Sequence, residues 1–307
     1  MKEKKIFNTK SDLIVECIEA ANELVPFETL KKGKISVTDI FIDSKLSKEI
    51  GKKEGNYSMI EFSDISSKIS KNKLKKVFQE KLMEFLNDFY LQKKDLIFIV
   101  GLGNEKSAPD SLGPLVVDKI KVNLEKKDFK ICSLIPGVMG ENGIDTVTLI
   151  EGIVSKIKPK VVIAIDSIMA NSINRLNSVI QISDSGIVPG SALSDNKKEL
   201  SKDTLNIPVI GVGVPTVVEG STIVSDTLDL IYESLKNITK NSDKKDLLGL
   251  IGELSEEERK IFFDSVLDKY EGGLSVTPKG IDFILKDISD VISEGINELK
   301  KANQSSL

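Results

Sequence analysis

The feature that most constrains the fold is a series of short, continuous apolar runs in the middle of the chain. They are DLIFIV at Asp95–Val100, VVIAI at Val161–Ile165 and PVIGVGV at Pro208–Val214. Segments with helix-like spacing lie between them. Such short, wholly apolar runs are typical of strands buried on both faces of a sheet, and their alternation with helices predicts an α/β fold. We expect a mostly parallel, twisted sheet flanked by helices.

Further elements are expected on either side of these runs. Lys34–Asp43 and Tyr57–Phe62 predict a small N-terminal strand pair around a turn at Gly51–Gly55. Phe129–Ile135 and Val179–Ile182 are expected as shorter strands of the main sheet. Helix-like spacing predicts helices over Asp12–Glu23, Lys71–Leu91, Leu112–Asn123, Ile144–Lys156, Ile168–Leu176 and Ser221–Lys236, and a helical tail over Lys244–Leu307.

These patterns divide the chain into three parts. Residues 1–12 form a polar tail, 13–240 an α/β domain, and 241–307 a C-terminal helical segment that packs on that domain. The start lacks the apolar core of a secretory signal, and no run approaches the roughly 20 apolar residues of a membrane helix. The net charge of −4 gives no electrostatic reason to expect nucleic-acid binding. Two cysteines are too few for a disulfide framework, so we expect a cytoplasmic protein with reduced thiols.

The most informative feature of the composition is the absence of histidine. Serine or cysteine nucleophiles that rely on an imidazole base are therefore excluded, and so is the HExxH metallopeptidase motif. A serine–lysine pair stays open. Otherwise proton transfer must be performed by aspartate, glutamate, lysine, tyrosine or water.

Two aspartates lie where an α/β sheet binds its ligands, beyond the carboxyl ends of strands. Asp166 directly follows the run Val161–Ile165, and Asp110 lies in the loop after Asp95–Val100. If these strands are neighbours, the two carboxyls face one crevice, where one acid holds a proton and the other accepts one from water. The alternative is that each aspartate caps the helix that follows it. The pattern GLG at Gly101–Gly103 gives only a weak hint of dinucleotide binding, because the third glycine of that motif is missing.

Longer motifs carry a resemblance to a known family. They are GLGN-x5-DSLGPLVVDKI at Gly101–Ile120, PGVMGENGIDT at Pro136–Thr146, the segments Lys158–Ser191 and Lys198–Ile231, and SVTPKGIDFI at Ser275–Ile284. In this order, through nearly the whole chain, they resemble the spore germination proteases. The resemblance implies an atypical aspartic endopeptidase, related in fold to hydrogenase maturation proteases, with Asp110 and Asp166 as its catalytic acids. It also implies small acid-soluble spore proteins as substrates, a homotetramer, and a location in the cytoplasm of the forespore or spore.

The resemblance further implies a precursor that removes its own N-terminal segment. The family cuts after an acidic residue that is followed by a large apolar one, with another acid downstream. Asp12-Leu13-Ile14-Val15-Glu16 fits this pattern. We therefore expect residues 1–12 to be a propeptide and the Asp12–Leu13 bond to be cleaved, although Asp12 can also cap the following helix.

For the chemistry we expect the two aspartates to activate water without a cofactor or a metal ion. Relatives can carry a histidine where this chain has Val188, which favours a metal-free pair. Backbone amides that could hold the developing oxyanion are expected in two loops, at Gly101, Gly103, Asn104, Gly137 and Gly140. Two alternatives stay open: a metal-assisted peptidase that uses the same aspartates, and a non-catalytic module that binds spore proteins or the precursor of a nickel enzyme.

Overall fold

The fold is known from a computed structural model of the chain. It describes residues 11–21, 27–125, 129–190, 198–220 and 274–299, and a few positions between 222 and 230. Most of the predicted tail, the domain boundary expected at 240 and most of the predicted helix Ser221–Lys236 lie outside the described residues. So does much of the expected helical tail, apart from its part within 274–299.

The nine strands of the described part form one sheet, in the order β1-β2-β3-β7-β8-β6-β4-β5, with β9 paired to β8. The neighbours β5, β4, β6 and β8 are parallel, which confirms the predicted parallel sheet for these four strands. In chain order the strands are β1 (Glu28–Lys32), β2 (Ile35–Ile42), β3 (Gly55–Phe62), β4 (Leu96–Gly101), β5 (Lys130–Leu134), β6 (Val161–Ala170), β7 (Val179–Ser183), β8 (Val209–Glu219) and β9 (Ser275–Val276).

Antiparallel strands extend this parallel region on one side. β7 pairs with β8, β3 with β7, β2 with β3 and β1 with β2, all antiparallel. The predicted N-terminal strand pair is therefore present as β2 and β3, but it belongs to the main sheet. Strand β1 was not predicted, because all five of its residues are exposed and its sequence shows no apolar alternation.

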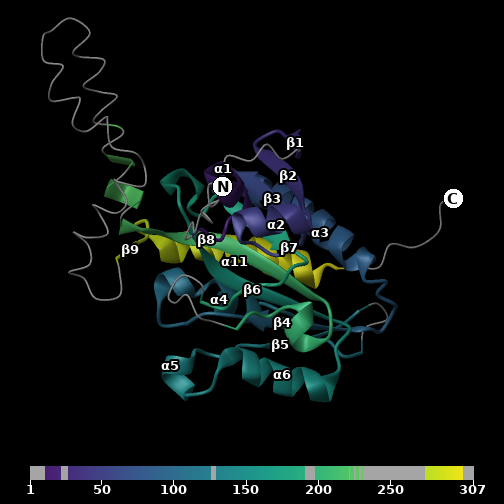
Figure 1. Cartoon of the computed structure of the whole chain (residues 1–307). Coiled ribbons are helices and arrows are strands. Elements are labelled where there is room, and N and C mark those ends of the chain that lie inside the picture. Colours follow the sequence, from purple (N-terminus) through teal and green to yellow (C-terminus); the bar gives the residue numbers. More distant parts are fainter. Residues whose placement is uncertain are drawn as a thin grey trace, which may run out of the picture.

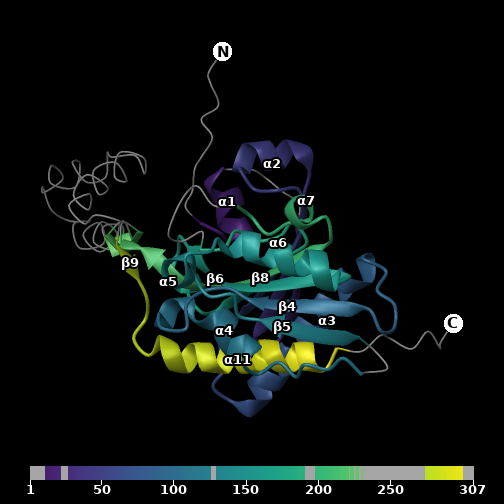
Figure 2. The same cartoon turned by 90° about the horizontal axis from the view of Figure 1, so that it is seen from below.

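Helices cover both faces of the sheet (Figures 1 and 2). The helices α3, α4 and α11 pack on one face, α6 and α7 pack on the other, and α1 and α2 lie on that second side over the antiparallel strands. Their bounds are α1 (Ile14–Ala20), α2 (Ser44–Ile50), α3 (Lys68–Asp88), α4 (Leu112–Val117), α5 (Met139–Asn142), α6 (Thr146–Ile157), α7 (Lys202–Leu205) and α11 (Ile281–Asn297). The mixed α/β fold, with a C-terminal helix packed on it, is thus confirmed.

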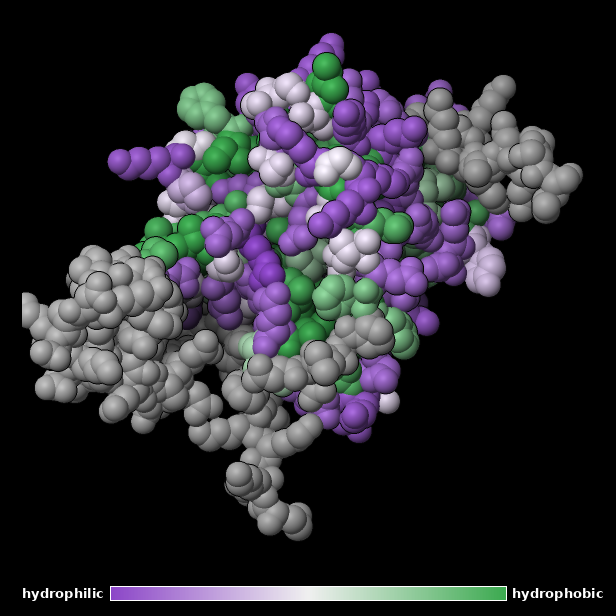
Figure 3. Space-filling view, turned by 90° about the horizontal axis from the view of Figure 1, so that it is seen from above, coloured by the Kyte–Doolittle hydropathy of each residue, from purple (hydrophilic) through white to green (hydrophobic). Residues whose placement is uncertain are grey.

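The alternation of β6 shows which face carries the candidate acid. Ile163 and Ile165 pack with α3, α4 and α11, whereas Val162 and Ala164 pack with α6 on the opposite face. Since side chains alternate along a strand, Asp166 belongs to the face of α6 and α1. None of the helices among the described residues has the length and apolarity needed to cross a bilayer. Hydrophilic residues cover most of the face seen in Figure 3, with hydrophobic patches between them.

Two predictions about element length were wrong. The predicted helix over Ile168–Leu176 is absent: β6 continues to Ala170, and only a short 3-10 turn follows at Ile173–Arg175. The two long strands β6 and β8 stay paired beyond Asp166, through a bulge after Ile168. The predicted helix Leu112–Asn123 ends earlier, at Val117, because the segment after it turns toward β5 and Asn123 bridges to Ile131.

Candidate active site

Asp166 lies inside strand β6, directly opposite Gly213 of β8. The prediction that Asp166 follows the end of its strand was therefore wrong. The neighbouring strand on the other side, β4, does end here, at Gly101, which pairs with Ile165. The Asp166 side chain is fully buried. Its Oδ1 accepts a hydrogen bond from the Ser167 N–H at 2.8 Å and its Oδ2 accepts one from the Gly190 N–H at 3.2 Å. The sheet and these two amides therefore hold the carboxyl in a fixed place.

The surroundings of Asp166 favour its protonated form. Burial raises the pKa of the Asp166 carboxyl well above its ordinary range, because the ionised group loses its hydration. The charge of Asp110 raises this pKa further, so the two acids are close enough to interact. The Gly190 and Ser167 amides act in the opposite direction, and Asp12 contributes a further, smaller rise. Asp166 thus keeps its proton at a pH where an ordinary aspartate is ionised.

Asp110 is carried by the loop between β4 and α4, at the end of a 3-10 turn over Ala108–Asp110. The loop is closed by its own backbone: the Asn104 N–H donates to the Asp110 carbonyl at 2.9 Å, and the Asp110 N–H donates to the Ser107 carbonyl at 2.8 Å. Gly103 has a φ of 106° and lies so close that a Cβ atom there would collide with the Asp110 carbonyl oxygen. The position of Asp110 therefore depends on glycine at 103.

A second glycine brings this loop against the strand that carries Asp166. The Leu102 N–H donates to the Ile165 carbonyl at 2.8 Å, which continues the pairing of β4 with β6 into the loop. Gly113, in the first turn of α4, packs on the backbone of Leu102 and Ile165, and a Cβ atom would collide with both. This close approach places the Asp110 loop beside the residue before Asp166.

Neither aspartate is the helix cap that its sequence position also allowed. Helix α4 begins at Leu112 with Ser111 as its N-cap residue, so Asp110 precedes the cap. No helix follows Asp166, because β6 continues to Ala170. The helix-cap alternative therefore applies to neither aspartate.

A cavity of about 210 Å³ lies on the Asp166 face of the sheet. Gly213, the residue opposite Asp166, and Gly211 of the same strand belong to its lining. A Cβ atom at Gly211 would press on the backbone of Gly186, and one at Gly213 on the side chain of Ile168. The two glycines thus allow Gly186 and Ile168 to pack closely on β8 beside the cavity, whose lining residues do not include Asp166 or Asp110 themselves. The polar residues of the lining include Asp12, Lys52, Lys53, Tyr57, Gln181 and Glu199.

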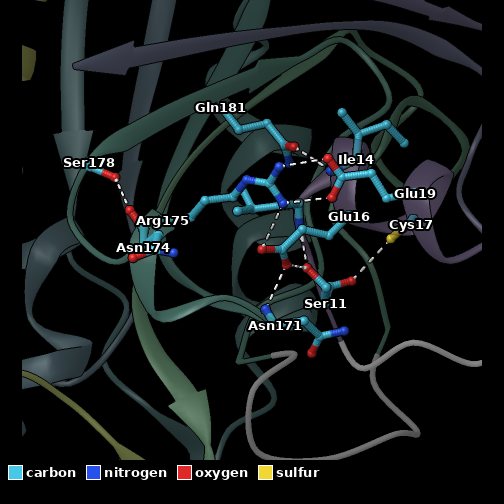
Figure 4. A network of polar contacts seen from close by, with 11 residues as sticks. Ser11, Ile14, Glu16, Cys17, Glu19, Asn171, Asn174, Arg175, Ser178 and Gln181 are labelled. Carbon is cyan, nitrogen blue, oxygen red and sulfur yellow. Dashed lines mark hydrogen bonds and ion pairs between the residues drawn. The ribbon is translucent and has the colours of Figure 1, made fainter. Parts of the chain in front are cut away.

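The predicted cleavage position lies at the rim of this cavity. The Asp12 N–H donates to the Met169 carbonyl at 3.0 Å, and the Asp12 side chain accepts from the Met169 N–H at 2.9 Å. The Gln181 side chain spans the next residues: its Nε2 donates to the Asp12 carbonyl at 3.0 Å, and its Oε1 accepts from the Ile14 N–H at 2.8 Å (Figure 4 shows the Ile14 bond). Leu13 and Ile14 are fully buried. Asp12 is not the N-cap of α1, since Leu13 occupies that position.

A polar network fixes α1 next to this segment (Figure 4). The Glu16 carboxylate is 5% exposed and accepts hydrogen bonds from the Ser11 hydroxyl and from the Asn171 N–H, the latter at 2.6 Å. Arg175 donates to Glu16 at 3.2 Å and pairs with Glu19 through both terminal nitrogens, at 2.9 and 2.8 Å. Helix α1 is therefore tied to the segment that follows β6.

The other predicted site residues take different places. The Asn104 N–H is used by the Asp110 carbonyl, so it belongs to the loop's own structure. Gly137 and Gly140 lie before and within α5. The α5 region meets the Asp110 loop through an ion pair between Lys106 and Glu141 at 2.8 Å. A role for the glycine amides in holding an oxyanion stays a prediction.

The sequence did not predict that the amides of Ser167 and Gly190 bind Asp166. It also did not predict that Lys52 and Gln181 each contact Asp12. Pro189-Gly190 reads as a turn in the sequence. Its position over Asp166 depends on contacts across more than 20 residues that no local pattern contains. Lys52 was one of many lysines, and nothing in its sequence neighbourhood distinguishes it.

Comparison with known proteins decides the family. A family model described as germination protease matches residues 4–244 and 234–305, which together span nearly the whole chain. The chain belongs to the germination protease family. Curated germination proteases from Bacillus cereus strain AH187 and Bacillus mycoides strain KBAB4 are each 36% identical to it over 342 aligned positions, covering 95% of this chain and 93% of the relative. That from Bacillus cytotoxicus is 35% identical with the same coverage.

Membership of the germination protease family shows that the chain is a peptidase of spore germination. Among solved structures, a [NiFe] hydrogenase maturation protease, HycI from Thermococcus kodakarensis KOD1, aligns with 69% of this chain and 98% of its own. Its TM-score is 0.32 and its sequence identity 17%, a similarity too weak to support an argument about this site.

Proposed function

We propose that this germination protease is an endopeptidase that begins the degradation of small acid-soluble spore proteins, and that Asp110 and Asp166 perform the hydrolysis. The observation that carries the proposal is the environment of Asp166, a fully buried acid whose strand neighbour Gly213 lines a cavity and whose pKa is raised by burial and by the charge of Asp110. Two carboxyls that interact in this way share a proton, which gives one site both an acid and a base.

In the proposed reaction the ionised carboxylate of the pair removes a proton from a water molecule, which attacks the scissile carbonyl carbon. The protonated carboxyl donates a hydrogen bond to the carbonyl oxygen and stabilises the negative charge that develops there. The tetrahedral intermediate then collapses, and the proton taken from water passes to the leaving nitrogen. Asp166 is suited to be the protonated partner because its pKa is raised.

The test replaces each acid by asparagine and measures cleavage of a purified small acid-soluble spore protein. Asp110→Asn and Asp166→Asn are each expected to lower the rate by about 10²-fold or more, the usual size of acid-base and electrostatic contributions. Asp118→Asn is the matched control, because this exposed aspartate lies nearby at the end of α4. Near-normal activity in either catalytic variant would refute the pair. Activity lost on dialysis against a chelator and restored by a divalent ion would favour the metal-assisted alternative.

We also propose that the chain is a zymogen whose residues 1–12 are released by its own cut between Asp12 and Leu13. The acid–apolar sequence at this bond supports the proposal, as does its position at the rim of the cavity beside Asp166. Because Leu13 and Ile14 are buried, the segment must open before the bond can be cut. Incubation at mildly acidic pH, read by mass spectrometry, is expected to yield a product that begins at Leu13. The same incubation of Asp166→Asn should leave the chain intact.

The proposed setting is the spore core, where the protease acts as a homotetramer without a cofactor and without binding nucleic acid or membrane. These points are supported only by the resemblance to the family and by the acidic charge of the chain. Mass photometry of the chain before and after processing tests the oligomeric state, and a mass of about four chains is expected. A monomer in both forms would contradict this part of the proposal.

A further inference from the structure

We propose that Lys52, Gln181 and the Met169 backbone form a subsite that binds an acidic residue of the substrate, and that Asp12 occupies this subsite in the precursor. The inference rests on the proposed function, since it names the residues that would select the substrate of the same site. It follows from how the chain's own segment around Asp12 is held.

The first observation is that Asp12 is held through both its backbone and its carboxylate. Met169, three positions beyond Asp166 in β6, exchanges two hydrogen bonds with Asp12, at 3.0 Å to the backbone and 2.9 Å to the carboxylate. The Gln181 amide binds the Asp12 carbonyl and the Ile14 N–H. The backbone contacts fix an extended peptide whatever its side chains are, whereas the bond from the Met169 N–H requires an acceptor oxygen where the Asp12 carboxylate lies.

The second observation is the charge of the subsite. Lys52 Nζ lies 3.8 Å from the Asp12 carboxylate, and both side chains are largely buried, with 26% and 19% of their surfaces exposed. The neighbouring Lys53 is already paired with Glu199, and with Asp203 at 2.7 Å. Release of residues 1–12 therefore removes the acid that the described part of the chain provides for Lys52, and leaves a half-buried ammonium. A substrate carboxylate restores the pair, whereas a lysine at this place is repelled.

The third observation is the path from this subsite to the catalytic acids. Lys52, Gln181 and Gly213 line one cavity, and Gly213 lies opposite Asp166 in the sheet. A peptide whose acidic side chain lies at Lys52 thus runs along the edge of a cavity whose wall includes Gly213, the strand neighbour of Asp166. The influence of the Asp12 charge on the Asp166 carboxyl agrees with this short path.

The test uses the processed enzyme and peptides with the sequence of residues 7–18 of this chain, which carry aspartate, asparagine or lysine in the place of Asp12. Lys52→Gln is expected to lower kcat/KM for the aspartate peptide about 10-fold, the usual loss for one charge-assisted contact, mainly through KM. Its effect on the asparagine peptide should stay within about 2-fold by the same reasoning. Lys52→Glu should prefer the lysine peptide to the aspartate peptide. Lys48→Gln, on the exposed side of α2, is the control and should change neither.

Equal losses with the aspartate and asparagine peptides would overturn the subsite, because they would show that Lys52 acts only on the structure. If the enzyme cuts neither peptide, the result contradicts the proposed function. The subsite is then tested by peptide binding alone. Fluorescence anisotropy with the full chain carrying Asp12→Asn, in which no carboxylate at position 12 competes, should show tighter binding of the aspartate peptide than the wild-type chain does. Adding Lys52→Gln should abolish that gain, and its persistence would overturn the proposal.

Discussion

The buried carboxyl of Asp166 makes the stability of the protein depend on pH in a way that a single substitution can reveal. Burial and Asp110 raise its pKa in the folded state, whereas the unfolded chain has the ordinary value. Between these two pKa values the folded state binds the extra proton, so the free energy of unfolding decreases as the pH rises. The slope contributed by one such group is at most about 1.4 kcal/mol per pH unit.

Asp166→Asn removes this slope. An asparagine can still accept from the Ser167 N–H, but its NH₂ group then faces Gly190 and loses that hydrogen bond, at a cost of about 1 kcal/mol. Below the ordinary aspartate pKa the variant is therefore expected to be less stable than wild type by about this amount. The two stability curves should cross about one pH unit higher, and at neutral pH the variant should be the more stable protein.

The assay is urea unfolding at a series of pH values from about 4 to 8, at fixed ionic strength and protein concentration, with mass spectrometry to confirm that no chain has been processed. Far-ultraviolet circular dichroism is the suitable signal because the chain has no tryptophan. Asp118→Asn, at an exposed position, should follow the wild-type curve, and Asp110→Asn should narrow the pH range over which the slope extends, because it lowers the pKa of Asp166. A constant difference between wild type and Asp166→Asn across this range would show that Asp166 ionises like an ordinary aspartate, and would refute the reasoning.

Three further predictions concern single residues. Arg175→Ala should destabilise the fold by about 3 kcal/mol in urea unfolding, because the buried Glu16 loses its cationic partner; a change below about 1 kcal/mol, the range of a surface pair, would contradict this. Gly103→Ala should strongly reduce peptidase activity by displacing the Asp110 loop, whereas Gly140→Ala, with open space around it, should have normal activity; equal activities would be inconsistent with the glycine requirement. Asp43→Ala should cost about 1 kcal/mol in the same unfolding assay, because this side chain caps α2 through two backbone amides; an unchanged midpoint would show that the cap is not needed.

The parallel strands at the centre of the sheet could be predicted from the sequence because they are continuous apolar runs. The prediction failed where a polar pair interrupts such a run: Asp166-Ser167 reads as a strand end, although β6 continues to Ala170. The continuation depends on pairing with β8, which lies more than 40 residues further along the chain. Strand β1 was not predicted because all its residues are exposed, so its sequence shows no alternation of apolar and polar residues.

The candidate site was predictable only in part. The two aspartates were chosen as candidates because each follows an apolar run, and the resemblance pointed to the same pair. Their surroundings were not: Gly190, Gln181 and Lys52 reach the site through long-range contacts, between residues that no short motif joins. The proposed catalytic aspartates thus follow a local pattern, whereas the residues around them are brought there by long-range contacts.

Asp166 and Asp110 lie in parts of the fold that differ in rigidity, a sheet strand and a loop. Asp166 sits in the middle of a hydrogen-bonded sheet, so it moves only if the sheet deforms. Asp110 lies on a short loop that is closed by three backbone hydrogen bonds within residues 104–110. Any change in the spacing between the two carboxyls is therefore expected to come from the loop that carries Asp110.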